Sequence, residues 1–220
     1  MILLLSGGID SFVAYHFLGE PRTIYFDMGT PYTEKEIKVV KTIDPNIIID
    51  DSLKFLGATQ TGEKAFIPHR NLYLAMRASS YDDKICIAGI KGDDVSDKTE
   101  RAFELFSHTL TEISGRDVLV FSPFWNMTKD EIVSWYLKYR DNPIDLVHGT
   151  VSCYSQSDTN YCGECPSCFR KWVSLINNGI EVPFHNFEMI KEYTKAALSN
   201  KYIHDRNVSI LRAIAKVYHV

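Results

Sequence analysis

A glycine turn near the start of the chain has the residue types that hold phosphate. Ser6-Gly7-Gly8-Ile9-Asp10-Ser11 follows the apolar run 1–5 and opens a stretch, 10–18, with apolar residues at helical spacing. Glycines let a backbone turn sharply and approach phosphate oxygens, and a helix N-terminus presents free N–H groups to an anion. A turn that merely joins a strand to a helix is the simpler alternative, but this context favours phosphate binding. The residues expected to bind phosphate are Ser6, Gly7, Gly8, Asp10 and Ser11.

Four of the five cysteines lie close together in the sequence with the spacing C-x8-C-x2-C-x2-C. They are Cys153, Cys162, Cys165 and Cys168. Thiolates at this spacing can converge on one ion, and four of them suit tetrahedral Zn²⁺, so we predict one structural zinc ion. An iron–sulfur cluster or a redox pair would use the same residues. The fifth, Cys86, stands in an apolar strand and is predicted to be a core residue.

Apolar runs and helical periodicities alternate before the cysteine segment. Strands are predicted at 1–5, 23–27, 46–50, 84–89 and 117–121. Helices are predicted at 10–18, 32–43, 71–81, 99–114 and 128–139, the last with a capping box formed by Thr128 and Glu131. This alternation predicts an α/β fold with a parallel sheet covered on both faces. Residues 169–220 are predicted to be helical, and the tail from about Phe184 contains no motif that we can interpret.

The overall composition limits the partners. A net charge of −4 argues against tight electrostatic binding of nucleic acid, and no apolar segment is long enough to span a bilayer. The N-terminus is apolar but lacks basic residues, so it indicates a buried strand rather than a signal peptide. We therefore expect a cytoplasmic protein, in which disulfides are disfavoured.

The glycine turn resembles the SGGxDS motif of the PP-loop, or N-type ATP pyrophosphatase, family. Members split ATP between its α- and β-phosphates and transfer AMP to a substrate oxygen. The resemblance implies a Rossmann-like (HUP-type), doubly wound, mainly parallel five-stranded sheet with a C-terminal zinc knuckle and helical tail. Residues 1–148 would form the ATP-binding domain, and residues 149–220 would pack on it. Asp10 would hold Mg²⁺ against the phosphates.

Further segments resemble the QueC branch of this family, the 7-cyano-7-deazaguanine synthases, over residues 1–175. Phe26-Asp27-Met28-Gly29 is similar to the family's Phe-Asp-Tyr-Gly, and Pro68-His69-Arg70-Asn71 to its Pro-Gly-Arg-Asn. Asp94 matches an aspartate after the fourth strand, and Lys129 matches a lysine after Pro123. Residues 146–171, with the cysteines, resemble its zinc segment.

The resemblance assigns roles to these residues. Those implied to act in catalysis are Asp10, Arg70, Asp94 and Lys129. Those implied to bind the nucleotide outside the glycine turn are Phe26, Met28, Gly29 and Asn71. Each has a plainer interpretation: Arg70 could form a salt bridge at a helix start, Lys129 could be an exposed first-turn residue, and Asp94 could belong to a simple turn.

In this branch, 7-carboxy-7-deazaguanine reacts with ATP and ammonia, first to an amide and then to a nitrile. The expected partners are therefore these small molecules, with a homodimer left open. This chain departs from the family at Val95–Arg101, which lacks the usual Tyr-Pro-Asp core, and at His69, which replaces a glycine. A product that stops at the amide, or a related deazaguanine substrate, stays open. So do two other functions: another PP-loop enzyme that amidates or thiolates tRNA, and a non-catalytic zinc-binding protein.

Overall fold

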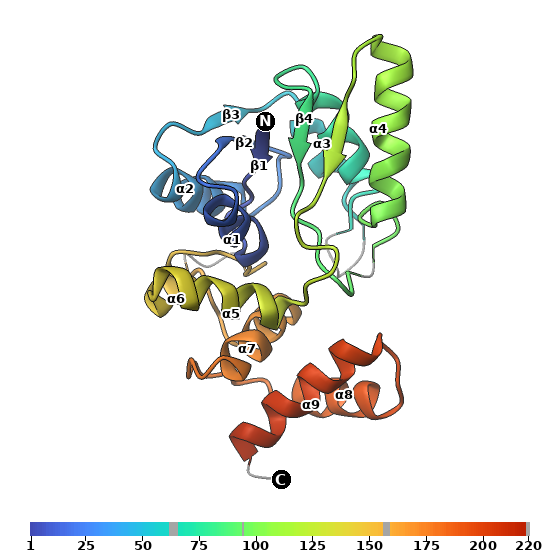
Figure 1. Ribbon diagram of the computed structural model, residues 1–220. Helices are drawn as coiled ribbons and strands as arrows, with labels where there is room; N and C mark the ends of the chain where they lie inside the picture. Colours follow the sequence, from blue (N-terminus) through green and yellow to red (C-terminus); the bar gives the residue numbers. More distant parts are fainter. Residues whose placement is uncertain (62–65, 94, 156–158, 219–220) are drawn as a thin grey trace.

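Five parallel strands form the centre of the protein. The computed structural model describes residues 1–61, 66–93, 95–155 and 159–218 (Figure 1). The strands are β1 (Ile2–Leu4), β2 (Arg22–Phe26), β3 (Ile48–Asp50), β4 (Lys84–Cys86) and β5 (Leu119–Phe121). They pair in the order β3-β2-β1-β4-β5, all in parallel. The predicted doubly wound sheet is confirmed, and its order reverses beside β1.

Helices lie on both faces of this sheet. The α-helices are α1 (Ile9–Phe17), α2 (Thr33–Ile43), α3 (Arg70–Ala78), α4 (Glu100–Ser114), α5 (Lys129–Arg140), α6 (Pro143–His148), α7 (Pro166–Asn177), α8 (Phe187–Leu198) and α9 (His204–Tyr218). A 3₁₀ helix, η1, spans Lys54–Thr59. Figure 1 shows α1 and α2 on one side of the sheet and α3 and α4 on the other.

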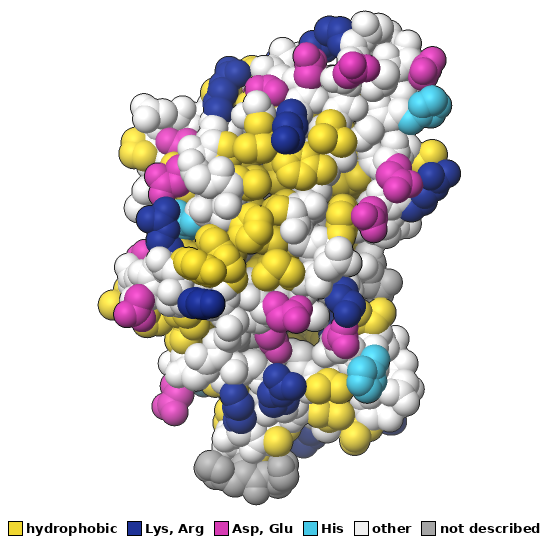
Figure 2. All heavy atoms as spheres, in the orientation of Figure 1, with side chains coloured by type: hydrophobic (Ala, Val, Ile, Leu, Met, Phe, Trp, Pro, Cys, Tyr) yellow, Lys and Arg dark blue, Asp and Glu magenta, His cyan; other side chains and the backbone are white. Residues whose placement is uncertain are grey.

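The two sheet faces form two hydrophobic cores because successive strand residues point to opposite sides. Leu3 and Cys86 pack with α1 and α5 in the first core, and Ile2 and Ile85 pack with α3 and α4 in the second. Cys86 is therefore a core residue, as predicted. Hydrophobic side chains also gather on the surface over the sheet between α1 and α4 (Figure 2).

The fourth strand is shorter than the predicted span 84–89. The Ser122 hydroxyl binds both the N–H of Gly89, at 3.0 Å, and its carbonyl, at 2.6 Å, in place of a strand partner. A Cβ at Gly89 would lie 2.3 Å from the Trp125 ring, so the backbone passes directly against that side chain. The connection after β4 therefore leaves the sheet early and turns toward the start of α5.

The C-terminal region forms a third core that includes the cysteine segment. Phe169 and Trp172 of α7 pack with Phe184, Ile210 and Ile214, which belong to the tail. The tail is helical as predicted, although two connections divide it into α7, α8 and α9. In the described parts of the chain, no helix combines the length and apolar character needed to cross a membrane.

Candidate phosphate site and metal centre

The glycine turn lies at the carboxyl end of β1, beside the point where the strand order reverses. In open α/β sheets, ligands bind in the crevice at this position. Gly7 adopts φ +78°, a left-handed conformation that glycine enters without a steric penalty. The Ser11 hydroxyl accepts from the Ser6 N–H at 3.2 Å and donates to the Gly8 carbonyl at 3.0 Å. The turn is thus held in shape above the N-terminus of α1.

Asp10 and Lys129 meet beside this turn, although 119 residues separate them. Asp10 lies in the first turn of α1, and Lys129 is the first residue of α5. The capping box places Lys129, because the Thr128 N–H donates to the Glu131 carboxylate at 2.7 Å and the Glu131 N–H donates back at 3.3 Å. The Lys129 ammonium forms an ion pair with Asp10, and both side chains are about one-fifth exposed (23% and 20%). A helix N-terminus and a lysine therefore converge where phosphate is expected.

A second acidic residue, Asp93, lies close to this ion pair. Its carboxylate accepts from the Lys98 ammonium at 2.8 Å and from the Ile90 N–H at 3.2 Å. Burial opposes its ionisation, but Lys98 and Lys129 hold the pKa of Asp93 below its ordinary value. Asp94, the aspartate chosen from the sequence, lies outside the described residues. Two adjacent aspartates in one turn carry the same side chain, so the sequence alone did not indicate that Asp93 lies within the electrostatic influence of Lys129.

Asn71 binds the segment that departs from the family pattern. Its backbone N–H and its side-chain amide donate to the two carboxylate oxygens of Asp97, at 2.9 and 2.8 Å. Asp97 therefore caps α3, whose own N-cap residue, His69, offers no side-chain bond. His69 has φ +56°, the left-handed conformation in which a glycine is ordinarily preferred. The predicted nucleotide ligand Asn71 thus joins α3 to the start of α4.

Arg70, at the start of α3, faces α2 rather than an acidic partner of its own helix. Burial raises the pKa values of Tyr32 and Glu36, and the positive charge of Arg70 opposes both shifts. No hydrogen bond or ion pair holds the Arg70 guanidinium to any residue that the structure describes. The salt bridge considered from the sequence is therefore not formed within the described part of the chain.

Glu36 yields a prediction about pH. Burial raises its pKa from 4.5 to about 7, while the Tyr25 hydroxyl donates to its carboxylate at 2.7 Å. Because the folded protein binds this proton more tightly than the unfolded chain does, the protonated carboxyl stabilises the fold at low pH. This contribution to the free energy of unfolding is lost as pH rises through about 7. Glu36→Gln should therefore increase the free energy of unfolding by about 1–2 kcal/mol at pH 8 and by little at pH 5.

Urea unfolding at the two pH values measures this difference. Glu34→Gln, on the exposed side of the same helix, is the matched control and should change stability equally at both. An equal effect of Glu36→Gln at pH 8 and pH 5 would contradict the assignment.

The predicted adenosine segment at the end of β2 contributes mainly backbone. The Phe26 ring is 4% exposed and lies in the second core, against which Met28 packs. Gly29 has φ +69°, and its N–H donates to Asp27 at 2.7 Å. A Cβ at Gly29 would lie 2.4 Å from the carbonyl oxygen of Lys54. Contact between Phe26 and a nucleotide is therefore limited to the main chain.

The four predicted cysteines converge. Their sulfurs all lie within 4.8 Å of one another, and the Cys162 and Cys168 sulfurs are 3.8 Å apart. A tetrahedral ion with metal–sulfur bonds of about 2.3 Å requires sulfur separations of about 3.8 Å. The N–H groups of Ser155 and Glu164 donate to the sulfurs of Cys153 and Cys162, each at 3.4 Å. The cluster can hold a metal ion, as predicted.

The cysteine cluster and the glycine turn are neighbours. The Val151 N–H donates to the Gly7 carbonyl at 2.8 Å, two residues before Cys153. Lys171 supports this segment from α7, since its ammonium donates to the carbonyls of Val147 and Thr150 at 2.8 and 2.9 Å. The Lys171 side chain is buried, a role that the sequence did not indicate because lysine is ordinarily exposed.

The family described as "Queuosine biosynthesis protein QueC" has a model that matches residues 18–179. The chain belongs to the QueC family. The match begins directly after α1 and covers β2 to β5 and the cysteine segment, so β1, the glycine turn and α1 precede it.

Curated relatives of this QueC protein extend over most of the chain. A protein from Methanococcus aeolicus is 26% identical, covering 83% of this chain and 97% of the relative. One from Methanocaldococcus jannaschii is also 26% identical and covers 82% and 96%. One from Staphylococcus epidermidis is 25% identical and covers 76% and 87%. All three are named 7-cyano-7-deazaguanine synthase.

Proposed function

We propose that this QueC protein is an ATP-dependent carbon–nitrogen ligase of queuosine biosynthesis, which converts 7-carboxy-7-deazaguanine and ammonia to 7-cyano-7-deazaguanine in the cytoplasm. The observation that carries the proposal is the ion pair between Asp10 and Lys129 at the phosphate turn. The pair brings a cation and a potential Mg²⁺ ligand to the N-terminus of α1. Membership of the family and the names of the relatives support the pathway and the product, and the resemblance to the QueC branch implies the substrate.

The proposed reaction activates a carboxylate with a poor leaving group. A carboxylate oxygen attacks the α-phosphorus of ATP, pyrophosphate leaves, and ammonia then displaces AMP to form the amide. A second ATP adenylates the amide oxygen, and loss of AMP with the amide protons leaves the nitrile. The protein contributes positioning and charge neutralisation.

The described residues divide this work. The main chain of the glycine turn and the hydroxyls of Ser6 and Ser11 would bind the departing pyrophosphate, whose charge Lys129 would neutralise. Arg70, a guanidinium without a partner in the described chain, would bind a phosphate or the substrate carboxylate. Mg²⁺ bound with ATP would lower the phosphate charge, and Asp10 is the residue that would hold it.

We propose zinc as the ion of the cysteine cluster, because four thiolates at these separations suit its tetrahedral geometry. Its role would be structural: it would join the segment after Val151 to α7. Within this proposal, residues 1–148 form the ATP-binding domain, and residues 149–220 form the zinc-binding helical region packed on it.

Turnover with defined substrates tests the function. The purified protein is incubated with ATP, Mg²⁺, ammonium and 7-carboxy-7-deazaguanine, and mass spectrometry follows AMP, amide and nitrile. We expect AMP and nitrile. Absence of AMP above background would refute adenylation, whereas AMP without either product would keep the ATP chemistry and reject this substrate.

A product that stops at the amide is the second candidate. The observation that favours it is the unusual segment after β4. Asn71 donates two hydrogen bonds to Asp97 of this segment, and Asp93 pairs with its Lys98. Asp97 and Lys98 occupy the place of the family's Tyr-Pro-Asp core. Accumulation of amide when ATP is in excess would identify this variant of the reaction.

A further inference from the structure

The C-terminal helix α9 lies against two segments beside the phosphate turn: the start of α5, which bears Lys129, and the turn after β4, which bears Asp93. It lies beyond residue 179, where the family match ends, and packs on α7 with α8. Ser209, in its first half, binds Asp130 at the start of α5, and Ile203, directly before the helix, lies against Gly92 in the turn after β4. In Figure 1 the connection after β4 descends from the sheet toward these helices. Lys129 and Asp93 are the immediate neighbours of those two contact points.

The contact with α5 is a three-helix junction around one carboxylate oxygen. Asp130 accepts from the Ser209 hydroxyl of α9 at 2.7 Å and from the Asn177 amide of α7 at 2.8 Å. The same Asn177 amide donates to the Ser209 carbonyl at 2.9 Å, which closes the triangle. Because Asp130 lies in the first turn of α5, the junction restricts the helix end from which Lys129 extends.

The hydrogen bonds of this junction add less to the free energy of unfolding than the same number of bonds would in a fully satisfied network. The other oxygen of Asp130 and the amide oxygen of Asn177 are buried without a partner among the described residues. Burial raises the pKa of Asp130, against the hydrogen bonds from Ser209 and Asn177. Unsatisfied buried acceptors offset the energy of the bonds that do form. A role in fixing geometry accounts for the junction better than a role in stability.

The contact with the turn after β4 is partly apolar and partly ionic. A Cβ at Gly92 would lie 2.7 Å from the Ile203 side chain, so this backbone rests directly on the residue before α9. Asp205 forms an ion pair with Lys91 at 2.5 Å. The Lys91 N–H also donates to the Met127 carbonyl at 2.9 Å, which ties the turn to the approach of α5.

We propose that α9 is a positioning element of the reaction site: Ser209, acting through Asp130, holds the first turn of α5 so that Lys129 reaches the phosphates, while Ile203 and Asp205 hold the turn that bears Asp93. The proposal rests on the function proposed above. It differs from the simpler view that α9 only completes the third core, because that view connects neither Ser209 nor Asp205 with Lys129.

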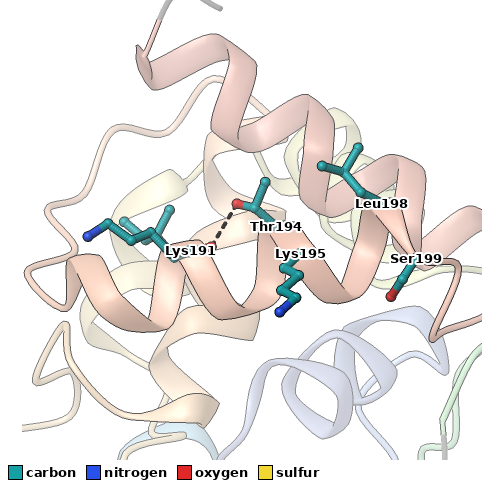
Figure 3. A pocket seen from close by; sticks show the side chains of 6 residues that line it. Lys191, Thr194, Lys195, Leu198 and Ser199 are labelled. Atoms are coloured by element: carbon teal, nitrogen blue, oxygen red, sulfur yellow. Dashed lines mark hydrogen bonds between the residues drawn. The ribbon is translucent and has the colours of Figure 1, made fainter.

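Ser209→Ala tests the proposal, with Ser199→Ala as the matched control. Ser199 lies just after α8 and donates only to the carbonyl of Ala196, at 3.0 Å. It lines a hollow of about 540 Å³ on α8 whose lining contains no residue of the phosphate turn. Figure 3 shows Ser199 in this hollow together with Lys195 and Leu198. Ser209→Ala should lower kcat for AMP formation about tenfold with little change in the KM for ATP, since small displacements of a catalytic group are costly. Ser199→Ala should leave both unchanged.

A double-mutant comparison separates positioning from a general loss of structure. In a Lys129→Met background, Ser209→Ala should have no further effect on kcat, because the group it positions is absent. An equal fold-loss of kcat in both backgrounds would overturn the proposal, as would an unchanged kcat in Ser209→Ala itself.

Hydrogen exchange tests the same contacts without turnover. In Ser209→Ala, amides of residues 128–132 should exchange faster than in the wild type or in Ser199→Ala. In Asp205→Asn, the increase should fall on residues 87–93. Unchanged exchange in both variants would refute the positioning role. Faster exchange in a protein that makes no AMP would refute the proposed function while supporting the contacts made by α9.

Discussion

Asp10→Ala is expected to reduce AMP formation by about 10²–10³-fold while the metal content stays the same. The side chain forms the ion pair with Lys129 at the N-terminus of α1, and it is the proposed Mg²⁺ ligand of the phosphate turn. Its removal takes away the carboxylate that holds Lys129 in place and the group that would hold the cation over the phosphates. The effect should fall on kcat and on the KM for Mg²⁺–ATP together.

The measurement is AMP release in parallel with metal analysis of the purified variant. Asp83→Ala is a matched control, because Asp83 is about half exposed (51%) and pairs with Arg116 far from the turn. That variant should retain full turnover. Asp10→Ala with wild-type turnover would show that the phosphate turn needs no acidic group, and the proposed role of Asp10 would be wrong.

Loss of the metal ion is expected to have the largest effect on stability. Cys168→Ala removes a buried ligand, and its sulfur lies 3.8 Å from that of Cys162. Binding of structural zinc contributes on the order of 10 kcal/mol in small zinc domains. A fraction of that energy would lower the melting temperature by about 10 °C or more, since 1 kcal/mol corresponds to about 2–4 °C for a chain of this size.

Calorimetry with metal analysis by mass spectrometry checks this expectation. Cys86→Ala serves as the control: it shortens a buried cysteine in the first core and should keep the ion. Iron in the wild-type protein would overturn zinc as the metal. Hydrogen exchange adds a second measurement, because the Val151 amide, which donates to Gly7, should lose protection in Cys168→Ala.

The sequence was sufficient where local chemistry and spacing define a feature. The turn at residues 6–11 and the four cysteines were identified from residue types at fixed intervals, and the alternation of strands and helices predicted the sheet. The capping box placed Lys129 correctly because Thr128 and Glu131 interact within one turn. Each of these features depends on neighbours that are close in the chain.

Features that depend on distant contacts could not be predicted in this way. Lys171 is buried because carbonyl groups at the end of α6 surround its ammonium, and no periodicity reports that arrangement. The bond between Asn71 and Asp97 spans 26 residues, so the changed segment after β4 appeared only as a departure from a pattern. The short helix α6, six residues long, was missed because so few residues show no periodicity.

The third core has a consequence for where this protein can be divided. The match to the family model ends at residue 179, yet Phe169 and Trp172 before that boundary share one buried core with Ile210 and Ile214 after it. An expression fragment trimmed to the region of similarity would present two large aromatic side chains to water and would tend to aggregate. The family-model match therefore ends before α8 and α9, whereas the packed core extends to Ile214 in α9, and a soluble fragment has to include both helices.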